Sequence, residues 1–230
     1  MSRATKMKFL ITGTSGGLGF ELANQLTSYG KVIGISRRVI AANKLSKNKQ
    51  FSHIASDLSN VDVAAKGSEL VNSLHEQINN EEFTLIINAA KFYAGNERLN
   101  SKEREKLFHL NIFSVMDLVE SLKNWKLKRI LFINSISGLI GQAFQHEYSA
   151  SKHALMGFVR SLIKEAKHLP FDVMSINPGG INTELWADYP DVTTNSFIPP
   201  AELAKIIITI LLTKHRLFIE NMVILPESDV

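Results

Sequence analysis

The sequence contains no cysteine, which excludes a disulfide framework, a thiolate metal site and a cysteine nucleophile. Long apolar runs are also missing. The longest late run, Ile206–Leu212, has seven residues, whereas a membrane-spanning helix needs ~20. The first apolar run, Phe9–Ile11, is too short for the core of a signal peptide. We therefore expect a cytoplasmic protein without a membrane partner.

A large excess of charge of one sign is missing as well. The chain has 26 Lys and Arg residues against 22 Asp and Glu residues, which gives a formal net charge of +4. So small an excess does not indicate nucleic-acid binding, although the basic stretch at residues 37–49 keeps a nucleic-acid-binding module open as an alternative. With 45% hydrophobic residues and only 6 prolines, the composition is that of a folded globular protein.

Short apolar runs alternate along the 230 residues with longer segments of helical periodicity. The predicted strands are Lys8–Thr12, Lys31–Ser36, Ser52–Ser56, Thr84–Asn88, Arg129–Asn134, Asp172–Asn177 and Phe218–Leu225. The predicted helices are Gly17–Tyr29, Asn60–Asn79, Ser101–Lys126, Glu147–His168 and Pro200–Thr213. This pattern predicts a single α/β domain over residues 1–230, with a doubly wound, seven-stranded, mostly parallel sheet flanked by helices.

A glycine-rich segment, Thr12–Gly19, lies between the first predicted strand and the first helix. Its spacing is Gly-x-x-x-Gly-x-Gly, which differs from the Gly-x-Gly-x-x-Gly of the standard dinucleotide fingerprint. Glycines at this place let the chain turn sharply and bring backbone N–H groups close to a pyrophosphate. A plain strand-to-helix turn is the alternative interpretation.

A second group of residues carries acid–base chemistry. Tyr148 and Lys152 are four residues apart on a predicted helix, so their side chains share one face. A free phenol has a pKa of ~10, and a nearby ammonium group lowers that pKa. Ser135 stands at the end of the fifth predicted strand, where open α/β sheets bind ligands. Its hydroxyl can hydrogen-bond a reacting carbonyl oxygen.

In this order, the motifs resemble those of the short-chain dehydrogenase/reductase superfamily, in its compact single-domain type with a Rossmann-type fold. The matching segments are Thr12–Gly19, Asp57-Leu58, Asn88–Lys91, Asn111, Ser135, Tyr148-x-x-x-Lys152, Pro178-Gly179 and Thr183. One segment departs from the family pattern: Asn88–Lys91 reads Asn-Ala-Ala-Lys where the family has Asn-Asn-Ala-Gly, and Lys91 is unusual near a cofactor.

The resemblance implies an NADP(H)-dependent oxidoreductase that interconverts a carbonyl and an alcohol on a small-molecule substrate, without a metal. It assigns Tyr148 as general acid/base, Ser135 to the carbonyl, Lys152 to Tyr148 and the ribose, and Asn111 to a proton relay. The cofactor-binding residues that it implies are Gly13, Thr14, Ser15, Gly17, Leu18, Gly19, Ser36, Arg37, Arg38, Asp57, Leu58, Asn88, Ala89, Ala90, Tyr148, Lys152, Pro178, Gly179, Ile181 and Thr183. It also implies a homodimer or homotetramer. The alternative is a catalytically idle NADP(H)-binding regulatory protein.

The preference for NADP(H) rests on the end of the second predicted strand. Dinucleotide folds that bind NAD place an acid there, and this chain has Ser36 followed by Arg37 and Arg38. An arginine can grip a phosphate with two charge-assisted hydrogen bonds. The alternative is that both arginines only begin the solvated stretch that runs to Lys49 and includes Lys44.

The segment between Thr183 and Pro199 is the most irregular part of the chain and is short for a substrate loop. Its shortness predicts an open or shallow substrate pocket. Trp186 and Tyr189 in this loop either line that pocket or pack the loop down.

Overall fold

The computed structural model describes residues 7–38, 45–63, 65, 68–165, 168–214 and 216–227. Its strands are β1 (Met7–Thr12), β2 (Gly30–Ser36), β3 (Phe51–Ala55), β4 (Phe83–Ile87), β5 (Leu127–Ile133), β6 (Asp172–Pro178) and β7 (Ile219–Ile224). Its helices are α1 (Gly17–Leu26), α2 (Glu69–Ile78), α3 (Ser101–Phe108), α4 (Ser114–Leu122), α5 (His146–Glu165) and α6 (Pro200–Leu211). No helix within the described ranges is long and apolar enough to cross a membrane.

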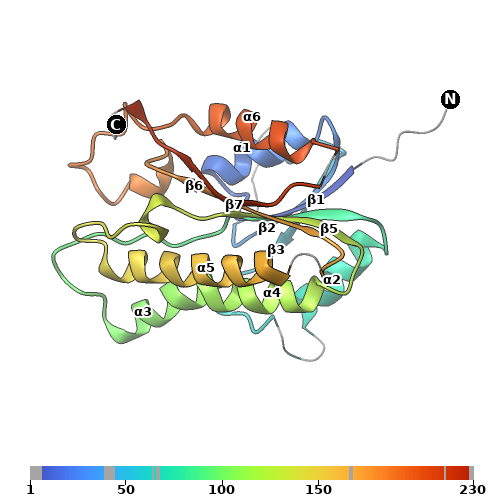
Figure 1. The fold of residues 1–230 in the computed structure, drawn as a ribbon, viewed down its shortest axis with the longest axis horizontal. Helices are drawn as coiled ribbons and strands as arrows, with labels where there is room; N and C mark the ends of the chain where they lie inside the picture. The colour runs from blue at the N-terminus through green and yellow to red at the C-terminus, as the bar shows by residue number, and fades with distance from the viewer. Residues whose placement is uncertain are drawn as a thin grey trace.

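The strands form one seven-stranded sheet in the order β3-β2-β1-β4-β5-β6-β7, and every neighbouring pair is parallel. The predicted doubly wound α/β fold is therefore confirmed. Figure 1 shows α1 and α6 on one face of the sheet, and α2, α4 and α5 on the other. The strand order reverses between β1 and β4, and in such sheets the ligand crevice lies at the carboxyl ends of the strands near this reversal.

The sheet is covered on both faces, which explains its nearly uninterrupted apolar strands. Alternate residues of a strand point to opposite faces. In β1, Leu10 belongs to the apolar cluster under α2, α4 and α5, while Phe9 and Ile11 belong to the cluster under α1 and α6. The run Ile206–Leu212 lies almost wholly in α6, where Ile207 is buried and Ile206 is exposed, so this helix is amphipathic.

Helix boundaries differ from the predictions more than strand boundaries do. The expected helix Ser101–Lys126 is interrupted by a wide π-helical turn at His109–Phe113 and ends at Leu122. The helix expected from Asn60 begins only at Glu69. The chain turns first because the backbone carbonyl of Asp57 accepts hydrogen bonds from the N–H groups of Asn60 and Val61. Lys44 of the basic stretch and residues 166–167 of the fourth predicted helix lie outside the described residues.

Candidate functional site

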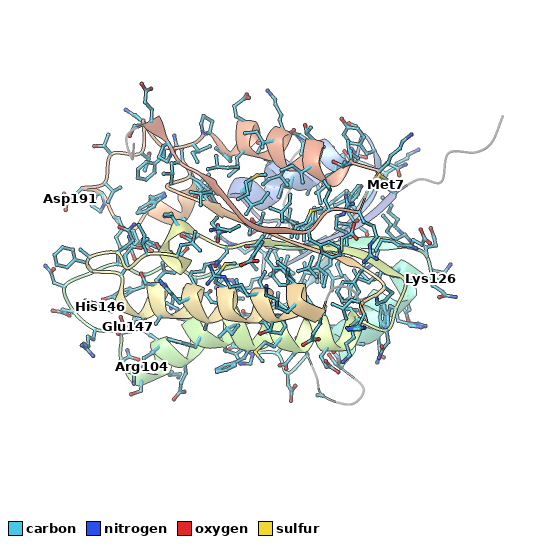
Figure 2. The ribbon with its side chains drawn as sticks, viewed as in Figure 1. Met7, Arg104, Lys126, His146, Glu147 and Asp191 are labelled. Atoms are coloured by element: carbon cyan, nitrogen blue, oxygen red, sulfur yellow. The ribbon has the colours of Figure 1, made fainter. Side chains whose placement is uncertain are left out.

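A cavity of about 470 Å³ opens at the carboxyl ends of the strands. In Figure 2, His146 and Glu147 at the start of α5 and Asp191 after β6 lie at this end, opposite Met7 and Lys126. Seventeen of the predicted cofactor residues line the cavity: Gly13, Ser15, Gly17, Leu18, Ser36, Arg37, Asp57, Leu58, Asn88, Ala89, Ala90, Tyr148, Lys152, Pro178, Gly179, Ile181 and Thr183.

Three predicted cofactor residues are not among the lining residues: Thr14, Gly19 and Arg38. Thr14 is fully buried and packs against β2, since a Cβ on Gly34 would lie only 2.5 Å from its Oγ1. Arg38 is exposed, and its backbone carbonyl accepts a hydrogen bond from the Ser36 hydroxyl at 3.0 Å. The cavity wall in this region therefore comes from Ser36 and Arg37.

At two positions, the backbone of the glycine-rich segment follows a path that only glycine allows. Gly13 has a φ of +79°, in the left-handed region. A Cβ on Gly19 would lie 2.1 Å from the Gly13 carbonyl oxygen and 2.5 Å from Asn88 Nδ2. The start of α1 can therefore approach the end of β1 closely, and the first N–H groups of α1 lie beside the cavity, where an anion is favoured.

Asn88 and Thr12 tie the end of β4 to this glycine-rich segment. The Thr12 hydroxyl oxygen accepts hydrogen bonds from the backbone N–H groups of Asn88 and Ala89 at 2.9 and 3.0 Å. In return, Asn88 Nδ2 donates to the carbonyl oxygens of Thr12 and Gly13 at 3.0 and 3.2 Å. A single asparagine is therefore enough to hold the turn, despite the departure of Asn88–Lys91 from the family pattern.

One end of the cavity lies where β2 and β3 finish. Arg37 follows β2 and Asp57 follows β3 there, close enough for their charges to interact. Burial alone would raise the pKa of Asp57, but hydrogen bonds from Ser59, the charge of Arg37 and a bond from Asn60 lower it below its usual range. The Asp57 carboxylate is thus charged near neutral pH. The arrangement leaves an exposed guanidinium at the cavity edge, able to meet an anion.

His53 lies on β3 beside Ser36, next to this end of the cavity, and the sequence did not indicate it. Its Nε2 lies 2.8 Å from the Ser36 hydroxyl oxygen. Burial lowers the pKa of His53, and a hydrogen bond to the backbone of Ser36 offsets part of that shift. The pairing joins β2 to β3, and no local motif in the sequence marks it.

Ser135, Tyr148 and Lys152 come together at the far end of the cavity. Ser135 follows β5, and its Oγ accepts a hydrogen bond from the Ser137 backbone N–H at 3.1 Å. Ser135 also lies close enough to the Tyr148 hydroxyl to lower the pKa of that group. Lys152 lies one turn further along α5, with its Nζ 5.8 Å from the centroid of the Tyr148 ring.

The protonation of this cluster differs from the sequence expectation. Burial raises the pKa of Tyr148 to about 12, and Ser135 offsets only part of the rise. Burial also lowers the pKa of Lys152 to about 8. The expected lowering of the Tyr148 pKa by Lys152 is therefore absent: burial dominates, and Ser135, not Lys152, is the side chain that lowers this pKa.

Asn111 lies behind the cavity wall, in the π-helical turn, and is 1% exposed. Its Oδ1 accepts a hydrogen bond from the Lys91 N–H at 2.8 Å, and its Nδ2 donates to the Lys91 carbonyl oxygen at 2.9 Å and to Ser151 Oγ at 3.0 Å. The backbone of Lys91 is thereby fixed to α5. Lys91 itself is absent from the residues that line the cavity.

Aromatic side chains line the cavity beside Tyr148. Phe92, Trp186 and Phe197 line it, and sequence reasoning missed the first and the last of these. Tyr189 packs against Phe92 and is not among the lining residues, so the two aromatic residues of the loop have different roles. The short loop after β6 lays Trp186 against Phe92 at this end of the cavity.

The cavity fits an extended dinucleotide. A glycine turn that a Cβ would fill lies in its middle, and a guanidinium lies at one end. The Oδ1 of Asn134, a 4% exposed residue of the cavity wall, has no hydrogen-bond partner and offers a buried acceptor. Within the described residues, no group of three or more His, Asp or Glu side chains could hold a metal ion.

Comparisons with known proteins agree with this geometry. The profile of the short chain dehydrogenase family matches residues 8–192. A 3-oxoacyl-(acyl-carrier-protein) reductase from Buchnera aphidicola subsp. Schizaphis graminum is 32% identical over 191 residues, which are 78% of this chain and 75% of the relative.

Two solved structures share the fold. The 3-ketoacyl-(acyl-carrier-protein) reductase from Brucella melitensis, complexed with NADH, has a TM-score of 0.83 at 18% identity and covers 97% of this chain and 98% of its own. A short chain dehydrogenase from Shigella flexneri, complexed with NADP, has a TM-score of 0.79 at 21% identity, with 94% and 95% covered. With its family profile, its relatives and its fold in agreement, the chain belongs to the short chain dehydrogenase family of oxidoreductases.

Proposed function

We propose that the protein reduces a carbonyl group on a small molecule with NADP(H), or oxidises the corresponding alcohol, and that Tyr148 is its general acid/base. The observation that carries the proposal is the meeting of Ser135, Tyr148 and Lys152 at one end of a cavity that suits a dinucleotide. Ser135 follows β5, whereas Tyr148 and Lys152 come from one face of α5, so the cluster joins two separate elements at the cavity.

In the reduction, a bound NADPH supplies the hydride that forms the new C–H bond at the carbonyl carbon. Tyr148 donates its hydroxyl proton to the carbonyl oxygen, so the C=O π bond becomes an alcohol O–H bond. Its pKa of about 12 means that this proton is present at neutral pH. Ser135 donates a hydrogen bond to the same oxygen and stabilises the charge that develops on it.

Lys152 supports this chemistry in two ways. With a pKa of about 8, its side chain is mostly protonated at neutral pH and stabilises the phenolate left on Tyr148. It also binds the nicotinamide ribose of the cofactor. Asn111, which holds the Lys91 backbone next to α5, is the residue that we assign to the proton relay serving Lys152.

Arg37 is the basis for proposing NADP(H) over NAD(H). It lies at the cavity edge beside Ser36, where NAD-binding folds carry an acid. The structural neighbours do not decide between the two cofactors, because the Shigella flexneri protein holds NADP and the Brucella melitensis protein holds NADH. The guanidinium of this chain supports the phosphorylated form.

A self-associated enzyme, a homodimer or homotetramer, fits the exposed apolar side chains of Phe113 in the π-helical turn and Met116 in α4, which are 53% and 42% exposed. A catalytically idle regulatory protein is not favoured, since binding a cofactor alone does not require Ser135 beside Tyr148. The test of the proposal is NADPH consumption by the purified protein with a panel of ketones, aldehydes and quinones. No consumption with any of them, while NADPH still binds, would contradict it.

A further inference from the structure

The cavity ends beside Tyr148 in an aromatic wall, which we define as Phe92, Trp186 and Phe197. The ring of Phe92 meets the Tyr148 ring edge-on at 4.9 Å between centroids and lies 4.7 Å from Trp186. Phe197 meets Trp186 at 5.1 Å. Flat groups on a ligand gain the same edge-to-face and offset contacts that aromatic rings make with one another. The wall therefore favours a flat apolar group next to the reacting carbonyl.

Hydrogen bonds hold the aromatic wall in place. The indole N–H of Trp186 donates to the carbonyl oxygen of Ile181 at 2.9 Å. Behind the wall, the Tyr189 hydroxyl oxygen accepts a hydrogen bond from the Ala94 N–H at 3.1 Å, and the Tyr189 ring lies 5.2 Å from that of Phe92. A wall fixed in this way loses little conformational entropy when a ring binds to it.

Charge is distributed unevenly along the cavity. Among the described lining residues, the cations are Arg37 and Lys152, and the acids are Asp57 and Glu184. Arg37 lies with Asp57 at the opposite end, and Glu184 points toward the glycine-rich segment, 3.6 Å from where a Cβ of Gly16 would be. Lys152 is the lining cation at this end, beside Tyr148, and the proposed function already engages it with the phenolate and the ribose. A substrate carboxylate at the aromatic wall would have no further cation of the described lining to pair with, and burying an unpaired carboxylate is costly.

Two amide side chains give this end of the cavity a polar side. Gln142 and Gln145 line it from the loop between β5 and α5. The Oε1 of Gln145 accepts a hydrogen bond from the Ser137 hydroxyl at 3.0 Å, which orients its amide. Side-chain amides donate well to neutral oxygen acceptors such as a second carbonyl or an ester.

Resting on the proposed function, we infer that the substrate is an uncharged aryl carbonyl compound with a second neutral oxygen acceptor, bound with its ring against Phe92, Trp186 and Phe197. Such a compound presents a ring to the aromatic wall and an oxygen to the glutamines. Its carbonyl oxygen reaches Ser135 and Tyr148.

The first experiment compares kcat/KM at saturating NADPH for ethyl benzoylformate, ethyl pyruvate and benzoylformate. The first two differ in the ring, and the first and third differ in the charge. One to two ring contacts are worth roughly a three- to tenfold preference, so we expect the aryl ester to exceed the aliphatic ester by that factor and the acid by more. Equal values for all three would overturn the inference while leaving the proposed function intact.

The second experiment changes the wall. Phe92→Leu should lower the ratio of aryl to aliphatic kcat/KM, mainly through KM for the aryl ester, because the leucine keeps bulk but loses the ring. Phe218→Leu, an exposed phenylalanine outside the cavity lining, is the matched control and should keep the ratio. Loss of activity with both esters in equal proportion would assign Phe92 to packing alone and would contradict its role in substrate choice.

A binding measurement separates this inference from the proposed function. The chain has 2 tryptophans, Trp125 and Trp186, and only Trp186 lines the cavity. In a Trp125→Phe variant with NADP⁺ present, ethyl benzoylformate should quench the remaining fluorescence at lower concentration than ethyl pyruvate does. Quenching without any NADPH oxidation would contradict the proposed function and support the aryl site. NADPH oxidation without selective quenching would support the proposed function and contradict the aryl site.

Discussion

The ammonium nitrogen of Lys152 lies over the Tyr148 ring, 5.8 Å from its centroid, and comes from one helical turn further along α5. Burial acts on the two groups in opposite directions and gives pKa values of about 12 for Tyr148 and about 8 for Lys152. Below pH 8, both groups carry their protons. This distribution suits a site that gives a proton to a carbonyl oxygen.

The buried ammonium of Lys152 predicts a pH-dependent stability. Between its folded pKa of about 8 and its ordinary 10.5, the unfolded chain binds more protons than the folded chain, so stability rises with pH across this window. Lys152→Met removes this effect. Across this pH window, the free energy of unfolding of the wild type should therefore rise relative to that of the variant, by on the order of 3 kcal/mol.

Urea unfolding of both proteins without cofactor, from neutral pH to about 10, measures this difference. Tyrosine, whose unfolded pKa is ~10, begins to titrate near the upper limit, but Tyr148 is present in both proteins, so its opposite contribution largely cancels from the difference. A difference between wild type and Lys152→Met that does not change with pH would show that Lys152 is not desolvated as the structure indicates.

Thr12 predicts a stability effect at the cofactor turn. Its hydroxyl oxygen accepts the N–H groups of Asn88 and Ala89, and the residue is 1% exposed. Thr12→Val keeps the shape but leaves both N–H groups without that partner, at about 1–3 kcal/mol for each. Thr12→Ser retains the hydroxyl and serves as the control. Urea denaturation that finds the valine and serine variants equally stable would exclude this anchoring role.

Gly19 offers a test of the close approach between α1 and β1. Gly19→Ala puts a Cβ 2.1 Å from the Gly13 carbonyl oxygen, so the turn must shift and NADPH affinity should fall more than tenfold. Gly141→Ala is a matched control, because nothing lies within 4 Å of its Cβ. NADPH titration of both variants measures the effect. Unchanged affinity in Gly19→Ala would mean that the turn does not hold the pyrophosphate.

Arg37 predicts the cofactor preference. A charge-assisted hydrogen bond contributes ~1.5–3 kcal/mol, so Arg37→Ala should weaken NADPH binding roughly ten- to a hundredfold and leave NADH affinity nearly unchanged. Arg38→Ala, next along the chain and outside the cavity lining, should have a much smaller effect. Both cofactors are titrated into the three proteins. Tighter NADH than NADPH binding by the wild type would refute the preference.

Strands were the most predictable part of the fold. The five inner strands are short, mostly apolar and buried runs, and the observed ends of all seven strands lie within two residues of the expected ones. The shape of the helix expected at Ser101–Lys126 was harder to predict. Its π-helical turn coincides with hydrogen bonds between Asn111 and Lys91, 20 residues away. Helical periodicity does not register such a long-range contact.

The candidate site, too, could be predicted from the sequence only in part. Regular spacing on one helix predicts that Tyr148 and Lys152 share a face, but it carries no information on desolvation, so the direction of the Tyr148 pKa shift was missed. Phe92, Gln145 and Phe197 come from three separate segments and meet only in the folded chain. Without a motif that joins them, the substrate end could not be derived from the sequence.

The central claim, that Tyr148 gives the proton, is tested most directly by Tyr148→Phe. The variant keeps the ring that packs against Phe92, so it should fold and bind NADPH like the wild type. With a carbonyl substrate that the wild type reduces, its kcat should fall by a factor on the order of 10²–10⁴, the usual contribution of general acid–base catalysis. NADPH oxidation by Tyr148→Phe at the wild-type rate would contradict the mechanism.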